Sequence, residues 1–173
     1  MNSTLLALLL VFVGTPSSGA EQPSAAATDE IRTLQTEFVG VLREKDTAKF
    51  LTYIGARGVA FGVDGAFQKR TDVAAEFHDK RGAYCILFDS TCLTVESRSR
   101  GRAMTGSPRL CSVSDLLTHD WQVKSKLGSY EGKPQTHLSI TAHASSCSNG
   151  REPVEFIFTR FADGWKLVAV PYT

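Results

Sequence analysis

The sequence predicts an α+β fold in which helices come first and an antiparallel sheet follows. In the first half of the chain, apolar residues recur at helical spacing at Ile31, Leu34, Phe38 and Val41. In the second half, runs rich in β-branched and aromatic residues alternate with turn sequences, as in FTRFADGWKLVAV at 158–170. Periods of about 3.6 and 2 residues are typical of helices and strands respectively. Helices grouped before strands favour α+β over a doubly wound parallel sheet.

The first 20 residues have the pattern of a cleavable signal peptide. An unbroken apolar run from Leu5 to Val13 is followed by small and turn-forming residues up to Ala20. The run is much shorter than the roughly 20 apolar residues that span a bilayer, so we expect no stable membrane anchor. We predict cleavage near Ala20 and export to the periplasm or the medium. A mobile lead-in at 21–27 and a single α+β domain over 28–173 should follow.

The charge balance and the cysteines narrow the functional classes. The chain has 19 Lys and Arg residues against 18 Asp and Glu residues. A net charge of +1 gives no general attraction for nucleic acid, so no nucleic-acid partner is expected. The four cysteines suit up to two disulfides in an oxidising compartment, and the sequence does not choose among three possible pairings. They are Cys85, Cys92, Cys111 and Cys147.

Three helices are expected in the first half of the chain. Thr28 is predicted to cap the first helix and Asp46 the second, because short oxygen-bearing side chains accept from the first free N–H groups of a helix. A third helix is predicted over 73–80, with Thr71 or Asp72 as its cap. We interpret the apolar stripes of the first two helices as core-packing faces.

A short hairpin and several later strands are expected. The stretch 59–63 alternates into Asp64-Gly65, a strong hairpin signal, and Phe67 begins the return strand. The apolar run YCILF at 84–88 is predicted as a short buried strand. Later strands are predicted at 121–127, 137–144, 154–161 and 165–170, with turns at 128–134 and 145–153.

The strand before the last turn is apolar on both faces. Its alternation places Phe156, Phe158 and Arg160 on one face and Ile157, Thr159 and Phe161 on the other, so both faces are partly apolar. Such a strand suits a sheet that is covered by helices on one side and by a partner or a loop on the other.

The order of these elements resembles the nuclear-transport-factor-2-like superfamily, including its SnoaL-like branch. The resemblance rests on REKDTAKFLTYI at 43–54, VAFGVDGAFQKRTDVAAEF at 59–77 and FTRFADGWKLVAV at 158–170. It implies N-terminal helices packed on a curved antiparallel sheet to form a cone, which often encloses a pocket. It also implies dimerisation through the outer face of the sheet, which is common among members.

Known catalytic and metal-binding patterns are missing from the sequence. There is no Gly-x-Ser-x-Gly or Ser-x-x-Lys motif for a nucleophilic serine. His137 and His143 lie about 20 Å apart along a straight strand, too far to share one metal ion. We therefore expect no metal and no cofactor.

The resemblance nevertheless makes four polar or aromatic groups candidates for a pocket. Enzymes of the superfamily, such as ketosteroid isomerase, scytalone dehydratase and limonene epoxide hydrolase, place a few polar groups in an apolar cone. His78 and Tyr84 flank the end of the third helix, and Asp120 and Trp121 open a strand. The alternative interpretations are a surface histidine, two core aromatics and a turn residue.

An irregular loop is predicted near 93–111, and a capped helical turn over 112–118. The loop contains a concentration of arginines, which we interpret either as an anion site or as a solvated charged loop. They are Arg98, Arg100, Arg102 and Arg109.

Taken together, the sequence favours an exported, non-catalytic binding module for a small apolar ligand or a partner protein. The first alternative is a lyase, isomerase or hydrolase of a small apolar molecule, with His78 or Asp120 as base and Tyr84 as donor. The second is an interaction domain that forms a homodimer. A ligand-binding module requires a mainly apolar cavity of about 300 Å³ or more, whereas an interaction domain should show a large apolar patch on its sheet.

Overall fold

The computed structural model describes residues 25–62, 66–99, 110–130, 132–147, 149 and 152–171. The helices are α1 (Ala25–Glu44), α2 (Thr47–Thr52), α3 (Arg70–His78), α4 (Ala83–Phe88), α5 (Ser90–Ser99) and α6 (Val113–Leu116). The strands are β1 (Val59–Phe61), β2 (Phe67–Gln68), β3 (Trp121–Tyr130), β4 (Lys133–Ala142), β5 (Val154–Phe161) and β6 (Gly164–Val170). The predicted signal peptide lies outside the described residues.

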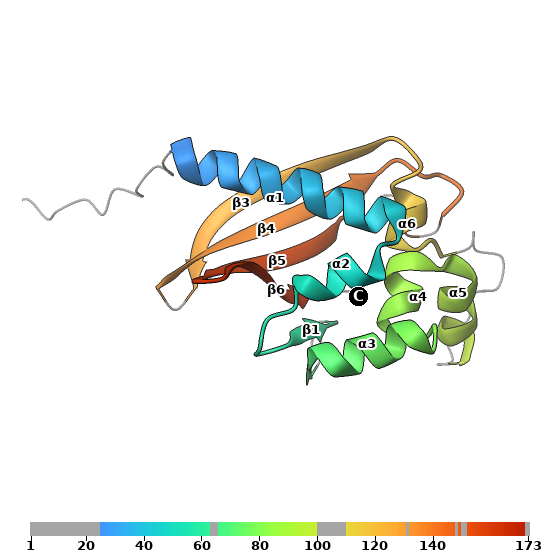
Figure 1. The fold of residues 1–173 in the computed structure, drawn as a ribbon. Helices are drawn as coiled ribbons and strands as arrows, with labels where there is room; N and C mark the ends of the chain where they lie inside the picture. The colour runs from blue at the N-terminus through green and yellow to red at the C-terminus, as the bar shows by residue number, and fades with distance from the viewer. Residues whose placement is uncertain are drawn as a thin grey trace, which may run out of the picture.

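The strands form one curved sheet with the order β2-β1-β6-β5-β4-β3. β1 runs parallel to β6, and all other neighbouring pairs are antiparallel. Figure 1 shows α1 lying along one face of this sheet, with α4, α5 and α6 gathered at one end of it. The α+β fold class, with helices packed on a curved sheet, is therefore confirmed, and the elements follow one another in the order on which the resemblance rests.

The start of α2 follows the prediction, whereas those of α1 and α3 do not. The Asp46 carboxylate accepts from the backbone N–H of Lys49 at 2.9 Å and caps α2 as expected. α1 begins at Ala25, so Thr28 is an internal residue of the helix and the last part of the predicted lead-in is helical. α3 begins after Lys69, whose own N–H donates to the Asp72 carboxylate at 3.0 Å. Asp72 therefore stabilises the first turn as a residue of the helix and not as its N-cap.

The predicted strand at 84–88 is wrong, because this segment forms α4. Helix formation starts where the Glu76 carboxylate accepts from the N–H of Ala83 at 2.7 Å. Leu87 and Phe88 are completely buried, so the short helix is apolar on nearly all sides and has no helical polarity pattern. A run of this kind does not distinguish a buried helix from a buried strand.

The predicted loop near 93–111 is helical at its start, because α5 extends to Ser99. The Asp89 carboxylate accepts from the backbone N–H groups of Thr91 and Cys92 and so fixes the first turn. The predicted helical turn after the loop is confirmed as α6, where the Ser112 side chain accepts from the N–H of Asp115.

The hairpins of the sheet are present, and one is longer than predicted. β1 and β2 pair as expected, although the turn residues 63–65 lie outside the described residues. β3 and β4 pair continuously from Trp121 opposite Ala142 to Tyr130 opposite Lys133. The predicted turn at 128–134 is therefore mostly strand.

The inner face of the sheet and the helices enclose a core that aromatic rings fill. The ring of Phe38 on α1 lies 5.0 Å from that of Phe156 and 4.9 Å from that of Phe158, both edge to face. Phe50 continues the cluster from α2, 5.7 Å from Phe38. All four rings are completely buried. Edge-to-face pairs add about 0.5–1.5 kcal/mol each beyond the burial of their area, so the interior of the cone is occupied by its own side chains.

Two disulfides fasten the smaller helices. Cys85 pairs with Cys92 and joins α4 to α5, with the Cα atoms 5.1 Å apart. Cys111 pairs with Cys147 and joins the segment before α6 to the end of the β4 region, with the Cα atoms 5.6 Å apart. The Asn149 side chain bonds both the N–H and the carbonyl of Cys111, at 3.0 and 2.9 Å. No helix within the described residues is long and apolar enough to cross a membrane.

Candidate functional site

The structure does not gather the four predicted pocket residues into a site. The side chain of His78 is 89% exposed, and its Nδ1 lies 3.0 Å from the Asp79 carboxylate. Asp120 is exposed, and Trp121 packs against the core. The ring of Tyr84 packs edge to face against Phe88, with the centroids 5.7 Å apart. None of the four lines the hollows described below.

Two groups with shifted pKa values have structural explanations. Hydrogen bonds from His78 and Arg81 lower the pKa of Asp79, which lies on the surface. Burial raises the pKa of Tyr53, and the negative charge of Glu37 adds to the effect. The Tyr53 ring packs edge to face on Phe38 at 5.2 Å, so it acts as a protonated core aromatic.

The predicted arginine cluster falls mostly beyond the described residues. Arg98 lies in α5, but its side chain is not described, and Arg100, Arg102 and Arg109 lie between 99 and 110. Among the described residues, no group of three or more His, Cys, Asp or Glu side chains could hold a metal ion.

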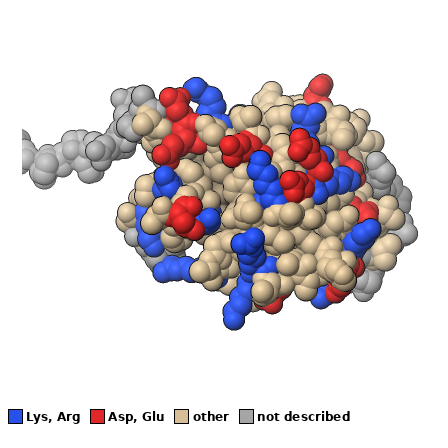
Figure 2. Space-filling model, viewed as in Figure 1, with Lys and Arg blue, Asp and Glu red and all other residues tan. Residues whose placement is uncertain are grey.

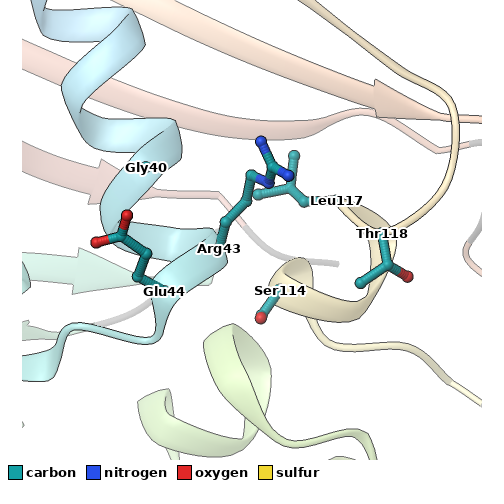
Figure 3. A pocket seen from close by; sticks show the side chains of 6 residues that line it. All are labelled: Gly40, Arg43, Glu44, Ser114, Leu117 and Thr118. Carbon is teal, nitrogen blue, oxygen red and sulfur yellow. The ribbon is translucent and has the colours of Figure 1, made fainter.

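One surface hollow lies between α1 and α6. It has a volume of about 550 Å³ and is lined by Gly40, Arg43, Glu44, Ser114, Leu117 and Thr118. Figure 3 shows Arg43 reaching toward Leu117, whereas the Glu44 carboxylate points to the other side of α1. Arg43 and Thr118 are exposed to solvent. A single exposed arginine beside two hydroxyl groups gives little to recognise a ligand.

A second hollowed surface lies on the face of the sheet opposite to α1, and we call it the outer-face groove. It comprises two adjoining hollows of about 190 and 360 Å³. Both hollows are lined by Arg57, Lys133, Phe161 and Val168, so they form one continuous groove. The first hollow adds Phe67, Gln135, Ile157, Thr159 and Ala169, and the second adds Gly55, Ala56, Gly58, Asp163, Lys166 and Leu167.

Strand register explains why apolar side chains reach this outer face. Phe156 and Phe158 point toward α1, so the intervening Ile157 points outward, where it stands opposite Ala169. The pairing shifts between Ile157 and Phe158, which leaves Val168 as an extra residue on β6. This irregularity adds Val168 to the outward side chains of the groove.

The rim of the groove carries positive charge. The Lys133 ammonium lies 4.8 Å from the centre of the Phe161 ring, a cation–π contact that holds it beside the floor. Among the described residues, no carboxylate pairs with Lys133. Lys166 is already engaged, since its ammonium lies 3.2 Å from the Asp163 carboxylate. Arg57 also lines both hollows.

Among the described residues, the helical side shows no contiguous group of exposed apolar side chains. Figure 2 shows its basic and acidic side chains interspersed, so neither sign dominates. The exposed apolar residues there are few, and Val95 on α5 is 62% exposed. By contrast, Phe67 at the end of the outer-face groove is 63% exposed and adjoins other apolar side chains. Single exposed apolar residues are ordinary, whereas a contiguous group indicates a binding surface.

The sequence contained part of the signal for this site. Alternation predicted that Ile157, Thr159 and Phe161 share one face of the sheet, and all three line the groove. Val168 and Phe67 were not predicted as site residues. The first depends on a local register shift and the second on the parallel pairing of β1 with β6, which brings the β1–β2 hairpin beside the last strand.

Comparisons with known proteins add a likeness in fold. No protein-family model and no curated protein matches the sequence. Among solved structures, the chain is similar to a designed protein named Rd1NTF2_05 with five substitutions, at 16% identity and a TM-score of 0.45. The alignment covers 84% of this chain and 98% of the designed one. A TM-score and a sequence identity this low carry no information about function.

Proposed function

We propose that this chain is an exported, non-catalytic binding domain that holds a small apolar ligand in the outer-face groove. The observation that carries the proposal is the contrast between the two faces of the sheet. The inner face is packed against Phe38 and Phe50, whereas the outer face presents two adjoining hollows of about 190 and 360 Å³, the first of which is lined by the exposed Phe67. Ligand sites are concave, mostly apolar and usually about 300–1,000 Å³ in volume.

Side chains of the described residues fill the inner face, where the cone shape suggests a ligand. Leu138 and Leu167 are completely buried beside the phenylalanine cluster. To admit a ligand, the core would have to open and lose close-packed contacts, at a cost of several kcal/mol for each large side chain displaced. A ligand at the outer-face groove displaces only water.

Export is the second part of the proposal. Two cysteine pairs at disulfide distance support an oxidising compartment, because thiols in the cytosol are mostly kept reduced. The apolar run before Ala20 supplies the expected signal. Mass spectrometry of the exported protein should give a mass that begins at Glu21, and a mass that retains the first 20 residues would contradict this part.

The groove is tested by titration of the full chain with N-phenyl-1-naphthylamine, an uncharged apolar dye that fluoresces when it leaves water. We expect saturable binding that Ile157→Glu weakens by about ten-fold or more, which corresponds to about 1.4 kcal/mol. Ile157 lies in the groove, and a carboxylate there would have to be desolvated by the dye.

Val95→Glu is the matched control, since it places the same charge on an exposed apolar position of α5. It should leave dye binding unchanged. A second groove variant, Phe67→Glu, alters an exposed side chain and so should fold normally while it weakens binding. Absence of binding, or equal effects of Ile157→Glu and Val95→Glu, would contradict the proposal.

A homodimer through the same surface is a second candidate, because Phe67 is exposed and adjoins the apolar floor. A two-fold interface would place the same patch of both copies face to face. A second copy would bring a second Lys133 ammonium into the interface, and Lys133 pairs with no carboxylate among the described residues. Sedimentation of the full chain distinguishes the two functions: we expect a monomer that binds dye, whereas a dimer dissociated by Phe67→Glu would favour the interaction domain.

A further inference from the structure

We infer that the outer-face groove is built for an amphipathic monocarboxylate, with its hydrocarbon tail across β6 and β5 and its carboxylate at Lys133. The inference rests on the proposed function and names the class of its ligand. The floor of Val168, Ala169 and Ile157 suits a hydrocarbon, and the cationic rim suits an anionic head.

Lys133 is the point at which the head group would bind. Its ammonium is held 4.8 Å from the Phe161 ring centre, and it pairs with no carboxylate among the residues that the structure describes. The other lysine of the groove, Lys166, is neutralised by Asp163 and also donates to the backbone carbonyl of Thr52 at 3.4 Å. One carboxylate is sufficient to pair with the Lys133 ammonium, whereas a phosphate ester carries nearly two negative charges.

The size of the groove limits the length of the tail. Between Phe67 on β2 and Gln135 on β4 the lining crosses four strand spacings, roughly 19 Å in total. An extended tail of about ten to twelve carbons, with C–C bonds of roughly 1.5 Å, is somewhat shorter than this span. A medium-chain carboxylate therefore fits along the apolar lining of the groove with its head group at Lys133.

A peptide suits the same floor less well. Most backbone groups of β4, β5 and β6 are used in pairing with one another, so few are left to bond a segment laid across the strands. Of the lining side chains on the floor, only Gln135 and Thr159 are polar. A peptide would bury N–H and carbonyl groups without partners at about 1–3 kcal/mol each, whereas a hydrocarbon tail has no such groups.

The experiment compares three ligands with the same ten-carbon tail on the full chain: decanoate, 1-decanol and decyltrimethylammonium. Each displaces N-phenyl-1-naphthylamine, and the displacement curves give the affinities. We expect decanoate to bind about two- to five-fold more tightly than 1-decanol, the size of effect that one partly exposed ion pair gives. The preference should shrink in 1 M salt, because added ions screen charges at the surface.

Two variants assign the preference to its residue. Lys133→Met keeps the length of the side chain and should abolish the advantage of decanoate over 1-decanol. Lys124→Met removes a lysine from the exposed surface of β3, away from the groove, and should leave the advantage intact. Circular dichroism and urea unfolding check that both variants are folded.

The possible outcomes separate the inference from the proposed function. One result would be that Ile157→Glu weakens the binding of dye and of 1-decanol while decanoate shows no advantage over 1-decanol. That result would support the groove as the binding site and contradict the carboxylate as its preferred head group. If the advantage survives in Lys133→Met, the head-group position is wrong. If no ligand displaces the dye, or if a peptide of alternating Phe and Glu binds more tightly than decanoate, the small-molecule class is overturned. If the dye itself does not bind, the proposed function falls as well.

Discussion

Gly58 occupies a position that other residues could adopt only with strain. Its φ is +85°, and a Cβ atom there would overlap the backbone carbonyl of Gln68 in the neighbouring strand. The left-handed region costs a residue with a side chain about 1–2 kcal/mol, and the overlap adds to this cost. We predict that Gly58→Ala lowers the free energy of unfolding in urea by at least about 2 kcal/mol.

Gly128 provides the control for this prediction. It lies in β3 with a negative φ, and a Cβ atom there would meet no other atom within 4 Å. Gly128→Ala should therefore change the free energy of unfolding by no more than about 0.5 kcal/mol. Equal losses in the two variants would show that the Gly58 backbone is not specially constrained.

At the scale of single residues, the sequence predicted the position of a side chain only where it predicted the element that carries it. His78 was a reasonable candidate base by type, but its place on the last turn of α3 leaves it exposed. Tyr84 lies on α4, which was predicted as a strand, and so its direction could not be inferred. Ile157 was placed correctly, because alternation along a strand fixes the face of each side chain.

The two disulfides hold elements whose own helices are short, and they should contribute unequally. Cys111 and Cys147 are 36 residues apart in sequence, whereas Cys85 and Cys92 are 7 apart. The chain-entropy model gives roughly 4 kcal/mol for the first and roughly 2 kcal/mol for the second, because a longer loop restricts the unfolded chain more.

We therefore predict that Cys111→Ala with Cys147→Ala destabilises the protein more than Cys85→Ala with Cys92→Ala. Urea unfolding of both double variants, compared with the unaltered chain, measures the difference. The reverse order would show that packing around α4 and α5, rather than loop closure, determines what each disulfide contributes.

Among the elements, those with a periodic pattern were predictable and those without one were not. The helical stripe of α1 and the alternation of β5 each reflect one buried face. α4 is buried on nearly every side, so its sequence carries no period from which to choose helix over strand. The start of α5 depends on Asp89 and was assigned to a loop, since the sequence beyond it is polar.

At the scale of the molecule, the fold class followed from the order of helices and strands, but the location of the candidate site did not. The cone shape that the resemblance implies suggests a ligand inside. The space inside the cone depends on how closely four phenylalanine rings approach one another in three dimensions, which the sequence alone does not show. They are Phe38, Phe50, Phe156 and Phe158. Large side chains at these positions fill the interior and leave the outer face as the surface available for binding.

The central claim is that the outer face of the sheet, and not the interior of the cone, binds the ligand. Methyl NMR spectra of the full chain during titration with decanoate test it most directly, because the sheet carries isoleucines on both faces. Ile157 lies in the groove, whereas Ile140 is 2% exposed in the core. We predict saturable shifts of the Ile157 and Val168 methyl signals with little change at Ile140. Shifts at Ile140 and Leu138 with none at Ile157 would place the ligand inside the cone and contradict the account.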